Sequence, residues 1–384
     1  MSSDDVCRRL HGKHIGLVTA FASRGNGGVF EAVAAQSALI RNAGGEVTVF
    51  ALEDEFGLSD RERLAGANLV LCPITGPRQI GYAPTLVDRL AATDLDCAHL
   101  HGIWMYPSRA VDLWGRRTGR PYVISPHGML DPWITRRGRW KKALARAGYE
   151  RAAWRGAAAM HALTAAEATD IAAETGRDEA IVIPNAAPAC TAQRTEMPDL
   201  CVVYIGRIHP KKNLSALVSG WSRTDLPTGA RLVIAGWGDA GDISELRNLL
   251  RTAPQSIEFV GAIFGEAKQK LLNQARFVVL PSLSEGLPMA ILEAWSGGVP
   301  TIMTRHCHLP RGFAETAAIE CGTDPADIAA ALQQALSIES GPWLAMSWAS
   351  QRLADGPFGE NAVARHWSDA YLGLIEAASL TRRG

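Results

Sequence analysis

Arg207 and Lys212 are two cations placed where a strand passes into a helix. The apolar run at 200–205 is typical of a buried strand, and Gly206 ends it. Arginine presents a planar fork of donors and lysine a compact charge, so the pair beside a helix N-terminus suits a diphosphate. A solvated basic turn is the alternative, and this stretch alone leaves both open.

Glu285 and Glu293 are two carboxylates placed around the start of another helix. Phe277–Leu280 is typical of a buried parallel strand, and the helical pattern begins at Pro288, a residue suited to the first helical position. Glu285 is therefore expected in the strand-to-helix loop, and Glu293 on the helix, roughly 7.5 Å along its axis. An ordinary strand–turn–helix whose glutamates bind nothing is the alternative.

The backbone just before this helix is expected to be open to a ligand. Leu287 precedes the helix and offers no capping oxygen, so the first backbone N–H groups are left for another partner. Gly286 beside it would let a ligand come close. Such a helix end suits a phosphate or a sugar hydroxyl.

His101 and His127 are expected at the carboxyl ends of strands in the first half, and each is followed by a glycine. Open α/β sheets bind ligands at that edge, and a histidine in a loop has few core contacts that would explain it. We therefore predict a functional role for His127. For His101 a functional and a structural role are equally supported.

Gly27 and Gly28 end a turn, Ser23–Gly28, between an expected strand at 14–20 and a helix at 29–42. The turn is too rich in glycine to be predicted helical. A loop between the first strand and its helix is where α/β sheets bind ligands, but its glycine spacing is not that of the dinucleotide motif. A tight turn without a ligand remains the alternative.

The composition is that of a globular protein. The 384 residues suffice for two domains, and equal numbers of basic and acidic residues, 39 each, give no global charge that would favour nucleic acid. The polar residues 1–5 are unlike a signal peptide, and no apolar run approaches the length of a spanning helix. Seven scattered cysteines without a Cys-x-x-Cys pair favour reduced core residues in a cytoplasmic protein.

Residues 131–160 form the strongest charge run of the sequence, with eight basic and two acidic residues and interleaved aromatics. A basic helix with aromatics can lie on an anionic membrane, on the inner face of the cytoplasmic membrane in this case. A solvated helix face with its aromatics turned to the core is the alternative. The basic residues are Arg136, Arg137, Arg139, Lys141, Lys142, Arg146, Arg151 and Arg155.

Short apolar runs alternate with helix-like stretches, which favours an α/β fold with parallel sheets and right-handed crossovers. The stretch 184–198 has three prolines and no periodicity, as a linker would. We therefore predict a first domain at 1–190, a second at 198–360, and a C-terminal helix within 361–384 that packs back towards the first domain.

Together these motifs resemble those of retaining glycosyltransferases of family 4. The resemblance rests on Gly206-Arg207 with Lys212, on the spacing of Glu285 and Glu293, and on His127-Gly128, and it covers most of the chain. It implies the GT-B architecture, in which two Rossmann-like domains with parallel sheets face an interdomain cleft. The segment at 127–133 is similar to a subgroup found in bacterial polysaccharide assembly.

The resemblance implies a role for each charged residue. Arg207 and Lys212 would bind the diphosphate of a UDP- or GDP-linked sugar and stabilise it as it leaves. Glu293 would bind the ribose hydroxyls. Glu285 would hold hydroxyls of the transferred sugar, which His127 would reach near its 6-position.

Backbone groups would complete the site. Gly286 and Leu287 would hold sugar hydroxyls, and His101 would lie on the acceptor side. The glycines implied at the donor site are Gly27 and Gly28 over the phosphates, Gly206 and Gly236 at strand ends, and Gly261 near the base. Pro288 lacks the N–H that many relatives offer, which leaves the number of donors open.

The resemblance implies an enzyme that needs neither a metal nor a cofactor, because Arg207 and Lys212 supply the positive charge that a divalent ion would. Asp94-Leu95-Asp96 precedes a strand and is interpreted as a cap or turn. Retention could pass through a glycosyl-enzyme on Glu285 or through front-face attack, and the family favours the latter. The sequence thus predicts sugar transfer from a nucleotide-diphosphate sugar to a glycan or polyprenyl-linked acceptor in cell-surface polysaccharide synthesis. A GT-B-like nucleotide-sugar epimerase and an inactive nucleotide-sugar-binding scaffold are the alternatives.

Overall fold

The computed structural model describes residues 9–64, 66–135, 139–190 and 193–382. The chain forms two compact units, and each is described by itself. Unit 1 comprises 1–185 together with 361–384, and unit 2 comprises 186–360. The sequence predicts a domain boundary within 190–198, whereas the structure places the change of unit directly after Asn185.

Unit 1 is built on a parallel sheet of seven strands in the order β3-β2-β1-β4-β5-β6-β7. The inner strands are short, almost wholly buried apolar runs, as expected for a sheet covered on both faces. The strands are β1 (His14–Phe21), β2 (Glu46–Leu52), β3 (Asn68–Cys72), β4 (Cys97–His101), β5 (Tyr122–Ser125), β6 (Ala159–Ala162) and β7 (Ala180–Val182).

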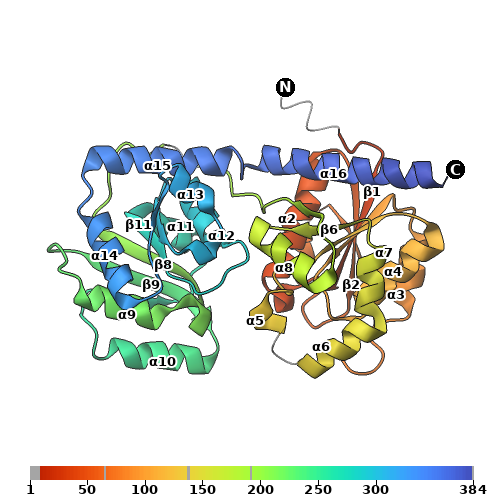
Figure 1. Ribbon diagram of the computed structural model, residues 1–384, viewed down its shortest axis with the longest axis horizontal. Helices are drawn as coiled ribbons and strands as arrows, with labels where there is room; N and C mark the ends of the chain where they lie inside the picture. Colours follow the sequence, from red (N-terminus) through yellow and green to blue (C-terminus); the bar gives the residue numbers. More distant parts are fainter. Residues whose placement is uncertain (1–8, 65, 136–138, 191–192, 383–384) are drawn as a thin grey trace. The chain divides into compact units, whose positions relative to one another are not determined.

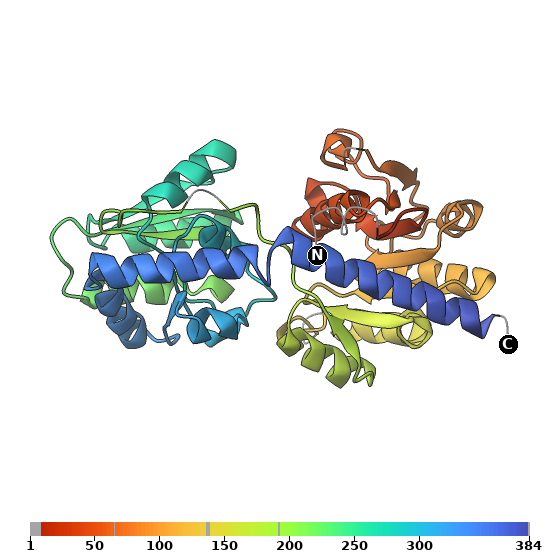
Figure 2. The same cartoon turned by 90° about the horizontal axis from the view of Figure 1, so that it is seen from above.

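Helices cover both faces of this sheet. Helices α3, α4 and α7 pack together over one core, which includes Trp114 and Trp154. The last helix of the chain, α16, lies along unit 1 beside α2, as Figures 1 and 2 show. The α-helices of the unit are α2 (Gly28–Asn42), α3 (Thr85–Ala92), α4 (Tyr106–Thr118), α5 (Pro132–Thr135), α6 (Arg139–Ala145), α7 (Arg151–Gly156), α8 (Ala165–Thr175) and α16 (Glu360–Thr381).

Three short turns of other helical types complete unit 1. They are the 3₁₀ helices η1 (Arg24–Asn26) and η2 (Arg61–Leu64) and the π-helix η3 (Arg146–Glu150). The prediction that the glycine turn is non-helical was wrong at η1. Ser23 accepts a hydrogen bond from the N–H of Gly25 and so caps a single 3₁₀ turn, which glycine does not prevent.

Unit 2 has a parallel sheet of six strands in the order β10-β9-β8-β11-β12-β13. Strand β8, at its centre, pairs with β9 in register from Cys201↔Arg231 to Ile208↔Gly238. The strands are β8 (Cys201–Ile208), β9 (Arg231–Gly238), β10 (Ile257–Gly261), β11 (Phe277–Leu280), β12 (Thr301–Met303) and β13 (Ala318–Glu320).

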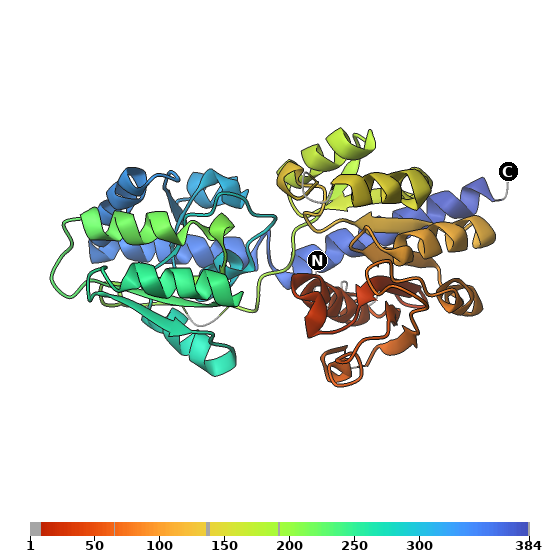
Figure 3. The same ribbon diagram turned by 90° about the horizontal axis from the view of Figure 1, so that it is seen from below.

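In unit 2, α9 packs against α10 and α14, and α12 packs against α15. Figure 3 shows α9 and α10 side by side. The helical elements are η4 (Pro210–Lys212), α9 (Leu214–Arg223), α10 (Ala240–Leu250), α11 (Gly265–Gln274), α12 (Met289–Ser296), η5 (Arg305–Cys307), α13 (Pro310–Ala314), α14 (Pro325–Leu336) and α15 (Ser340–Asp355).

The predicted α/β fold with two parallel sheets is confirmed. The start of α12 differs by one residue from the prediction. Pro288 has extended backbone angles and takes the N-cap position, so the helix begins at Met289. The cap has no side-chain hydrogen bond, so the helix end remains uncapped, as the sequence indicated.

Candidate active site

The side chain of Lys212 meets that of Glu285 in unit 2. Lys212 ends the 3₁₀ turn η4, and Asn213 then adopts a left-handed conformation that turns the chain into α9. Lys212 Nζ lies 2.5 Å from Glu285 Oε1, which also accepts a hydrogen bond from Ser282 Oγ at 2.6 Å. The two charged side chains are only 21% and 10% exposed, so the pair is poorly screened by water.

The loop that carries Glu285 is held by two neighbouring segments. Leu283 N–H donates to Lys211 C=O at 2.8 Å, and Glu285 N–H donates to His306 C=O at 3.1 Å. Within the part of the chain that the structure describes, the N–H groups of Gly286 and Leu287 have no hydrogen-bond acceptor. The loop therefore offers a fixed carboxylate beside two open backbone donors.

Arg207 and Glu293 are engaged by partners that the sequence did not indicate. Arg207, at the end of β8, contacts Asp239 Oδ2 through its Nη2 at 3.1 Å and remains half exposed. Glu293 on α12 forms an ion pair with Lys268 of α11, 2.5 Å apart. The structure thus joins Lys212 to Glu285 and leaves Arg207 and Glu293 in two separate ion pairs.

Gly206 and Gly236 were expected to end their strands but lie within them, since β8 continues to Ile208 and β9 to Gly238. The glycines of this region are required for different physical reasons. A Cβ at Gly236 would lie 2.0 Å from the carbonyl oxygen of Gly206 on the adjacent strand, so strand packing alone excludes a side chain there. A Cβ at Gly206 would lie 2.9 Å from the Tyr204 hydroxyl. Gly261 has φ +75° and open space around it, so its conformation requires glycine.

In unit 1 the structure brings His101 and His127 together. His101 Nδ1 lies 2.9 Å from His127 Nε2, and the two rings stack with centroids 5.2 Å apart. Burial lowers the pKa of His127 to about 3 and that of His101 well below its ordinary value. Both imidazoles are therefore neutral at physiological pH.

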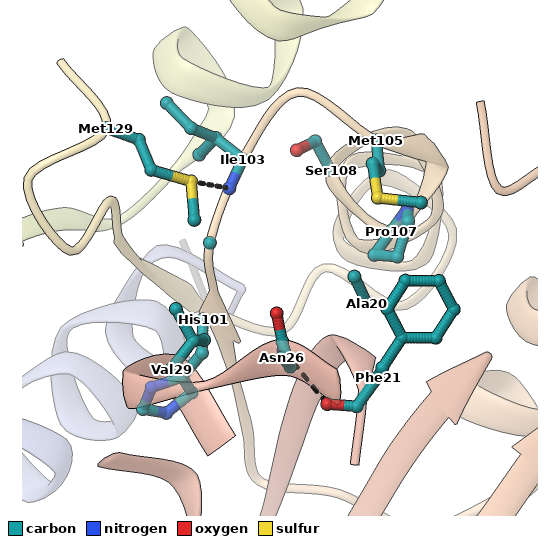
Figure 4. A pocket seen from close by; sticks show the side chains of 11 residues that line it. Ala20, Phe21, Asn26, Val29, His101, Ile103, Met105, Pro107, Ser108 and Met129 are labelled. Atoms are coloured by element: carbon teal, nitrogen blue, oxygen red, sulfur yellow. Dashed lines mark hydrogen bonds between the residues drawn. The ribbon is translucent and has the colours of Figure 1, made fainter. Parts of the chain in front are cut away.

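A pocket opens beside His101 at the carboxyl ends of β1 and β4 (Figure 4). Its lining is mostly apolar, with Asn26, His101 and Ser108 as polar members. Asn26 Nδ2 is held by the carbonyl oxygen of Phe21 at 2.9 Å. Gly27 and Gly28, which follow Asn26, have open space where a Cβ would stand, and Gly27 has φ +56°.

Glu167 is a buried carboxylate that the sequence analysis did not single out. Its Oε1 accepts from the N–H of Gly128 at 2.6 Å, and its Oε2 accepts from the N–H of Leu163 at 2.8 Å. Glu167 therefore ties the loop of His127 to the end of β6. The sequence could have indicated it, because Thr164 and Glu167 have the spacing of a capping box, and Thr164 does cap α8.

Glu150 was also missed, since it was counted as part of a charged run, yet its side chain is fully buried. Its Oε1 accepts from the backbone N–H of Trp104 at 2.5 Å and from Ser108 Oγ at 2.9 Å. Trp104 has φ +78°, a strained value for a bulky residue, and Tyr149 donates to its carbonyl oxygen at 2.9 Å. Glu150 and Tyr149 together hold the loop between β4 and α4.

Burial raises the pKa of Glu150 from its ordinary 4.5 to about 7. The folded protein therefore binds a proton that the unfolded chain has released, and stability should fall as pH rises from about 4.5 to 7. A shift of this size corresponds to roughly 3 kcal/mol. We expect thermal unfolding of Glu150→Gln to lose this part of the pH dependence. Identical pH profiles for variant and wild type would contradict the assignment.

The basic run at 131–160 divides into inward and outward residues. The cations of Lys142 and Arg146 lie over the ring of Trp104, 5.7 and 5.3 Å from its centroid. On α6, by contrast, Trp140 and Leu144 are 66% and 65% exposed. In the second half of the run, by contrast, Glu150 and Trp154 are buried. Arg136 and Arg137 lie outside the described residues.

Among the described residues no group of three or more His, Cys, Asp or Glu side chains is arranged to hold a metal ion. Asp96 accepts from the backbone N–H of His14 at 2.9 Å, and Asp94 pairs with Arg120 at 2.6 Å. The six described cysteines are unbridged, and Cys7 lies outside the described residues. Within the same part of the chain, no helix is both long and apolar enough to cross a bilayer.

Two protein-family models match this chain, one in each unit. Residues 27–186 match the glycosyl transferase 4-like domain, and residues 199–337 match glycosyl transferases group 1. Most of each unit is therefore similar to a glycosyltransferase domain.

Solved structures agree on the fold. The Anabaena protein HepE in complex with UDP and glucose superposes with a TM-score of 0.74 at 14% identity, over 94% of this chain and 100% of that one. The lipopolysaccharide outer core galactosyltransferase WaaB superposes with a TM-score of 0.66 at 17% identity, over 94% and 99%. Both likenesses support the GT-B fold.

Curated relatives match over shorter stretches. The O-antigen chain mannosyltransferase B of Escherichia coli is 29% identical over 143 residues, which is 36% of this chain and 37% of that protein. An uncharacterized glycosyltransferase of Methanocaldococcus jannaschii is 29% identical over 103 residues, 27% of this chain and 26% of that protein. The matches thus span between about a quarter and somewhat more than a third of the length of these relatives.

Proposed function

We propose that this protein is a retaining glycosyltransferase of family 4 that moves a hexosyl group from a nucleotide-diphosphate sugar to a glycan or polyprenyl-linked acceptor. The observation that carries the proposal is the Lys212–Glu285 pair beside the uncapped start of α12. A cation for the diphosphate and a carboxylate for the sugar lie side by side there. The curated relative in O-antigen synthesis supports a role in cell-surface polysaccharide assembly.

In this proposal the donor replaces ion pairs that the free protein makes. Lys212 turns from Glu285 to the diphosphate, and Arg207 contributes a second cation from its half-exposed position. Glu285 and the open N–H groups of Gly286 and Leu287 receive the sugar hydroxyls. Glu293 receives the ribose hydroxyls.

The base is proposed to lie near Gly261, against two aromatic side chains. Trp237 at the end of β9 and Phe264 just before α11 are 48% and 65% exposed, and their ring centroids lie 5.7 Å apart. Exposed aromatic faces suit stacking with a nucleobase. UDP is the first candidate, because the superposed HepE structures contain UDP or UDP-glucose.

Unit 1 is proposed to bind the acceptor, with Gly27 and Gly28 near the phosphates and His127 near the sugar. His127 is neutral, so it acts by hydrogen bonding and not as a cation. We favour front-face attack, in which the leaving diphosphate accepts the proton of the acceptor hydroxyl. The O–H bond breaks as the new glycosidic bond forms and the bond to the diphosphate breaks. Arg207 and Lys212 stabilise the charge that develops on the leaving group.

The test is incubation with UDP- and GDP-sugars, with and without a polyprenyl-linked glycan, in EDTA. A transferase forms glycosylated acceptor and nucleoside diphosphate, and the proposal expects this product without added metal. Isomerised or hydrolysed donor in the absence of acceptor would instead show the epimerase-like alternative. Donor binding without turnover in any mixture would show the scaffold. Activity that needs Mg²⁺ or Mn²⁺ would contradict the metal-free mechanism.

A cytoplasmic location at the inner face of the membrane is proposed through α6. Trp140 and Leu144 are four residues apart and therefore share one side of the helix. The exposed cations Arg139 and Lys141 flank them, and α6 lies at the periphery of unit 1 in Figure 1. Exposed apolar side chains beside basic ones are the pattern of a helix in an anionic lipid interface.

We predict that the protein co-sediments with vesicles containing phosphatidylglycerol and is released at high salt. The variant Trp140→Ser/Lys141→Glu/Leu144→Ser should bind at least about 10-fold less, because it loses the apolar anchors and reverses one charge. Leu58→Ser removes another exposed leucine of unit 1, 75% exposed, and is the control. Equal binding to phosphatidylcholine vesicles, or no binding to either kind of vesicle, would mean that α6 is a solvated helix without a membrane role.

A further inference from the structure

A chain of hydrogen bonds runs through the core of unit 1, and only one assignment of donors and acceptors fits it. It ends at the carbonyl oxygen of Ile183, which only accepts, so His161 must donate to it through Nε2–H at 2.8 Å. His161 Nδ1 is then an acceptor for the hydroxyl of Ser125 at 2.7 Å. Burial lowers the pKa of His161 to about 4, in keeping with a neutral ring.

The chain of hydrogen bonds continues to Tyr371 on α16 and Gln36 on α2. The Ser125 oxygen accepts from His99 Nε2–H at 2.6 Å, which leaves His99 Nδ1 to accept from the Tyr371 hydroxyl at 2.7 Å. The Tyr371 oxygen in turn accepts from Gln36 Nε2 at 3.1 Å. Both nitrogens of His99 are therefore occupied. Its ring lies against that of His101 at an interplanar angle of 32°, with centroids 4.1 Å apart, but neither nitrogen of His99 is left to bond His101.

His101 is thus left with one hydrogen-bond partner among the described residues. Its Nδ1 meets His127 Nε2, while its buried Nε2 has no partner in that part of the chain. A buried N–H without an acceptor costs more free energy than a buried acceptor without a donor. The unpaired Nε2 should therefore carry no proton. The proton of His101 then sits on Nδ1 and is donated to His127.

This arrangement sets the tautomer of His127. Its Nε2 accepts from His101, so its own proton must sit on Nδ1. No described residue accepts a hydrogen bond from that Nδ1, and the residue is only half buried. The loop that carries His127 is fixed. The residue has φ +54°, and the N–H of Gly128 donates to Glu167.

We infer that His101 is a positioning residue that holds His127 in the Nδ1–H tautomer, so that His127 meets the transferred sugar as a neutral hydrogen-bond donor. The inference rests on the proposed function for the identity of the sugar, but the tautomer is a property of the free protein. It excludes His127 as a general base through Nε2. It also gives His101 a role distinct from direct contact with the acceptor.

The first test is nuclear magnetic resonance of the free wild-type protein labelled with ¹⁵N at histidine. Long-range ¹H–¹⁵N spectra distinguish a protonated from a bare ring nitrogen. His127→Gln and His101→Asn spectra assign the signals. We expect His127 to carry its proton on Nδ1 and His101 to carry its proton on Nδ1, unchanged between pH 6 and 8. A proton on Nε2 of His127 would overturn the inference, whether or not the protein transfers sugar.

The second test separates positioning from packing. His101→Leu keeps the volume but removes the donor, and should lower kcat by about 10-fold with donor KM little changed, the scale of one neutral hydrogen bond. His101→Asn restores a donor close to the position of Nδ1 and should recover most of kcat. Equal rates for His101→Leu and wild type, with the expected tautomer present, would overturn the positioning role. Absence of transfer by the wild type would refute the proposed function but leave the tautomer measurement valid.

Discussion

Replacing Lys212 by alanine should lower kcat/KM for the donor by at least about 100-fold, and Arg207→Ala should do the same. Each cation is proposed to stabilise charge that develops on the leaving diphosphate, and loss of one such contact typically has this scale. Lys212 is fixed beside Glu285 in a poorly exposed position, so its charge is little screened by water. The measurement is steady-state kinetics with donor varied at saturating acceptor.

Lys270→Ala is the matched control, because Lys270 is an exposed lysine on α11 with no role in the proposed site. Lys212→Ala also leaves Glu285 without its cation, so its melting temperature must be recorded beside its rate. Lys212→Gln retains a hydrogen-bond donor without the charge and should be nearly as slow. Wild-type turnover in folded Lys212→Ala or Arg207→Ala would remove that residue from the catalytic site.

Substitution of Glu285 and of Glu293 should affect different kinetic parameters. Glu285 lies beside the open helix end where the sugar is proposed to bind, and a carboxylate there favours the positive charge that the sugar gains in the transition state. Glu293 is proposed to contact only the ribose, which is bound alike before and during reaction. Glu285→Gln should therefore depress kcat more than it raises donor KM, and Glu293→Gln should mainly raise donor KM.

Kinetics of the two folded variants under identical conditions decide this prediction. Glu315→Gln serves as a control, since Glu315 pairs with Arg311 on the surface of unit 2. If Glu285→Gln changes only KM, the sugar does not bind where the loop places it. If Glu293→Gln reduces kcat alone, the orientation of the donor along α12 is reversed.

The fold was predictable because local patterns agreed with it along the chain. Buried parallel strands appear in the sequence as apolar runs, and β11 coincides with the run at Phe277–Leu280. Strand β8 begins one residue after the start of the run at 200–205 but continues through Gly206 to Ile208, so the prediction that Gly206 ends it was wrong. The loop position of Glu285 followed from the same pattern, as did the missing side-chain cap of α12. These features depend on residues close together in sequence.

The partners of the site residues were not predictable, because they come from distant segments. Lys268 on α11 meets Glu293 on α12 only in the folded unit, and Glu150 reaches Trp104 across 46 positions of sequence. The charge pattern at 131–160 could not separate Glu150 from its exposed neighbours, since its partners Trp104 and Ser108 lie far away in the sequence. Nor could the sequence reveal that Gly236 faces Gly206 rather than a ligand.

The most direct test of the proposed donor site is calorimetric titration of the protein, in EDTA, with UDP, UMP, GDP and GMP. We predict that one diphosphate binds at least about 10-fold more tightly than its monophosphate, because only its second phosphate reaches both Arg207 and Lys212. The difference should disappear in Lys212→Ala and persist in Lys270→Ala. Equal affinity for diphosphate and monophosphate, or no binding of any of the four nucleotides, would contradict the assignment of this site to a nucleotide-sugar donor.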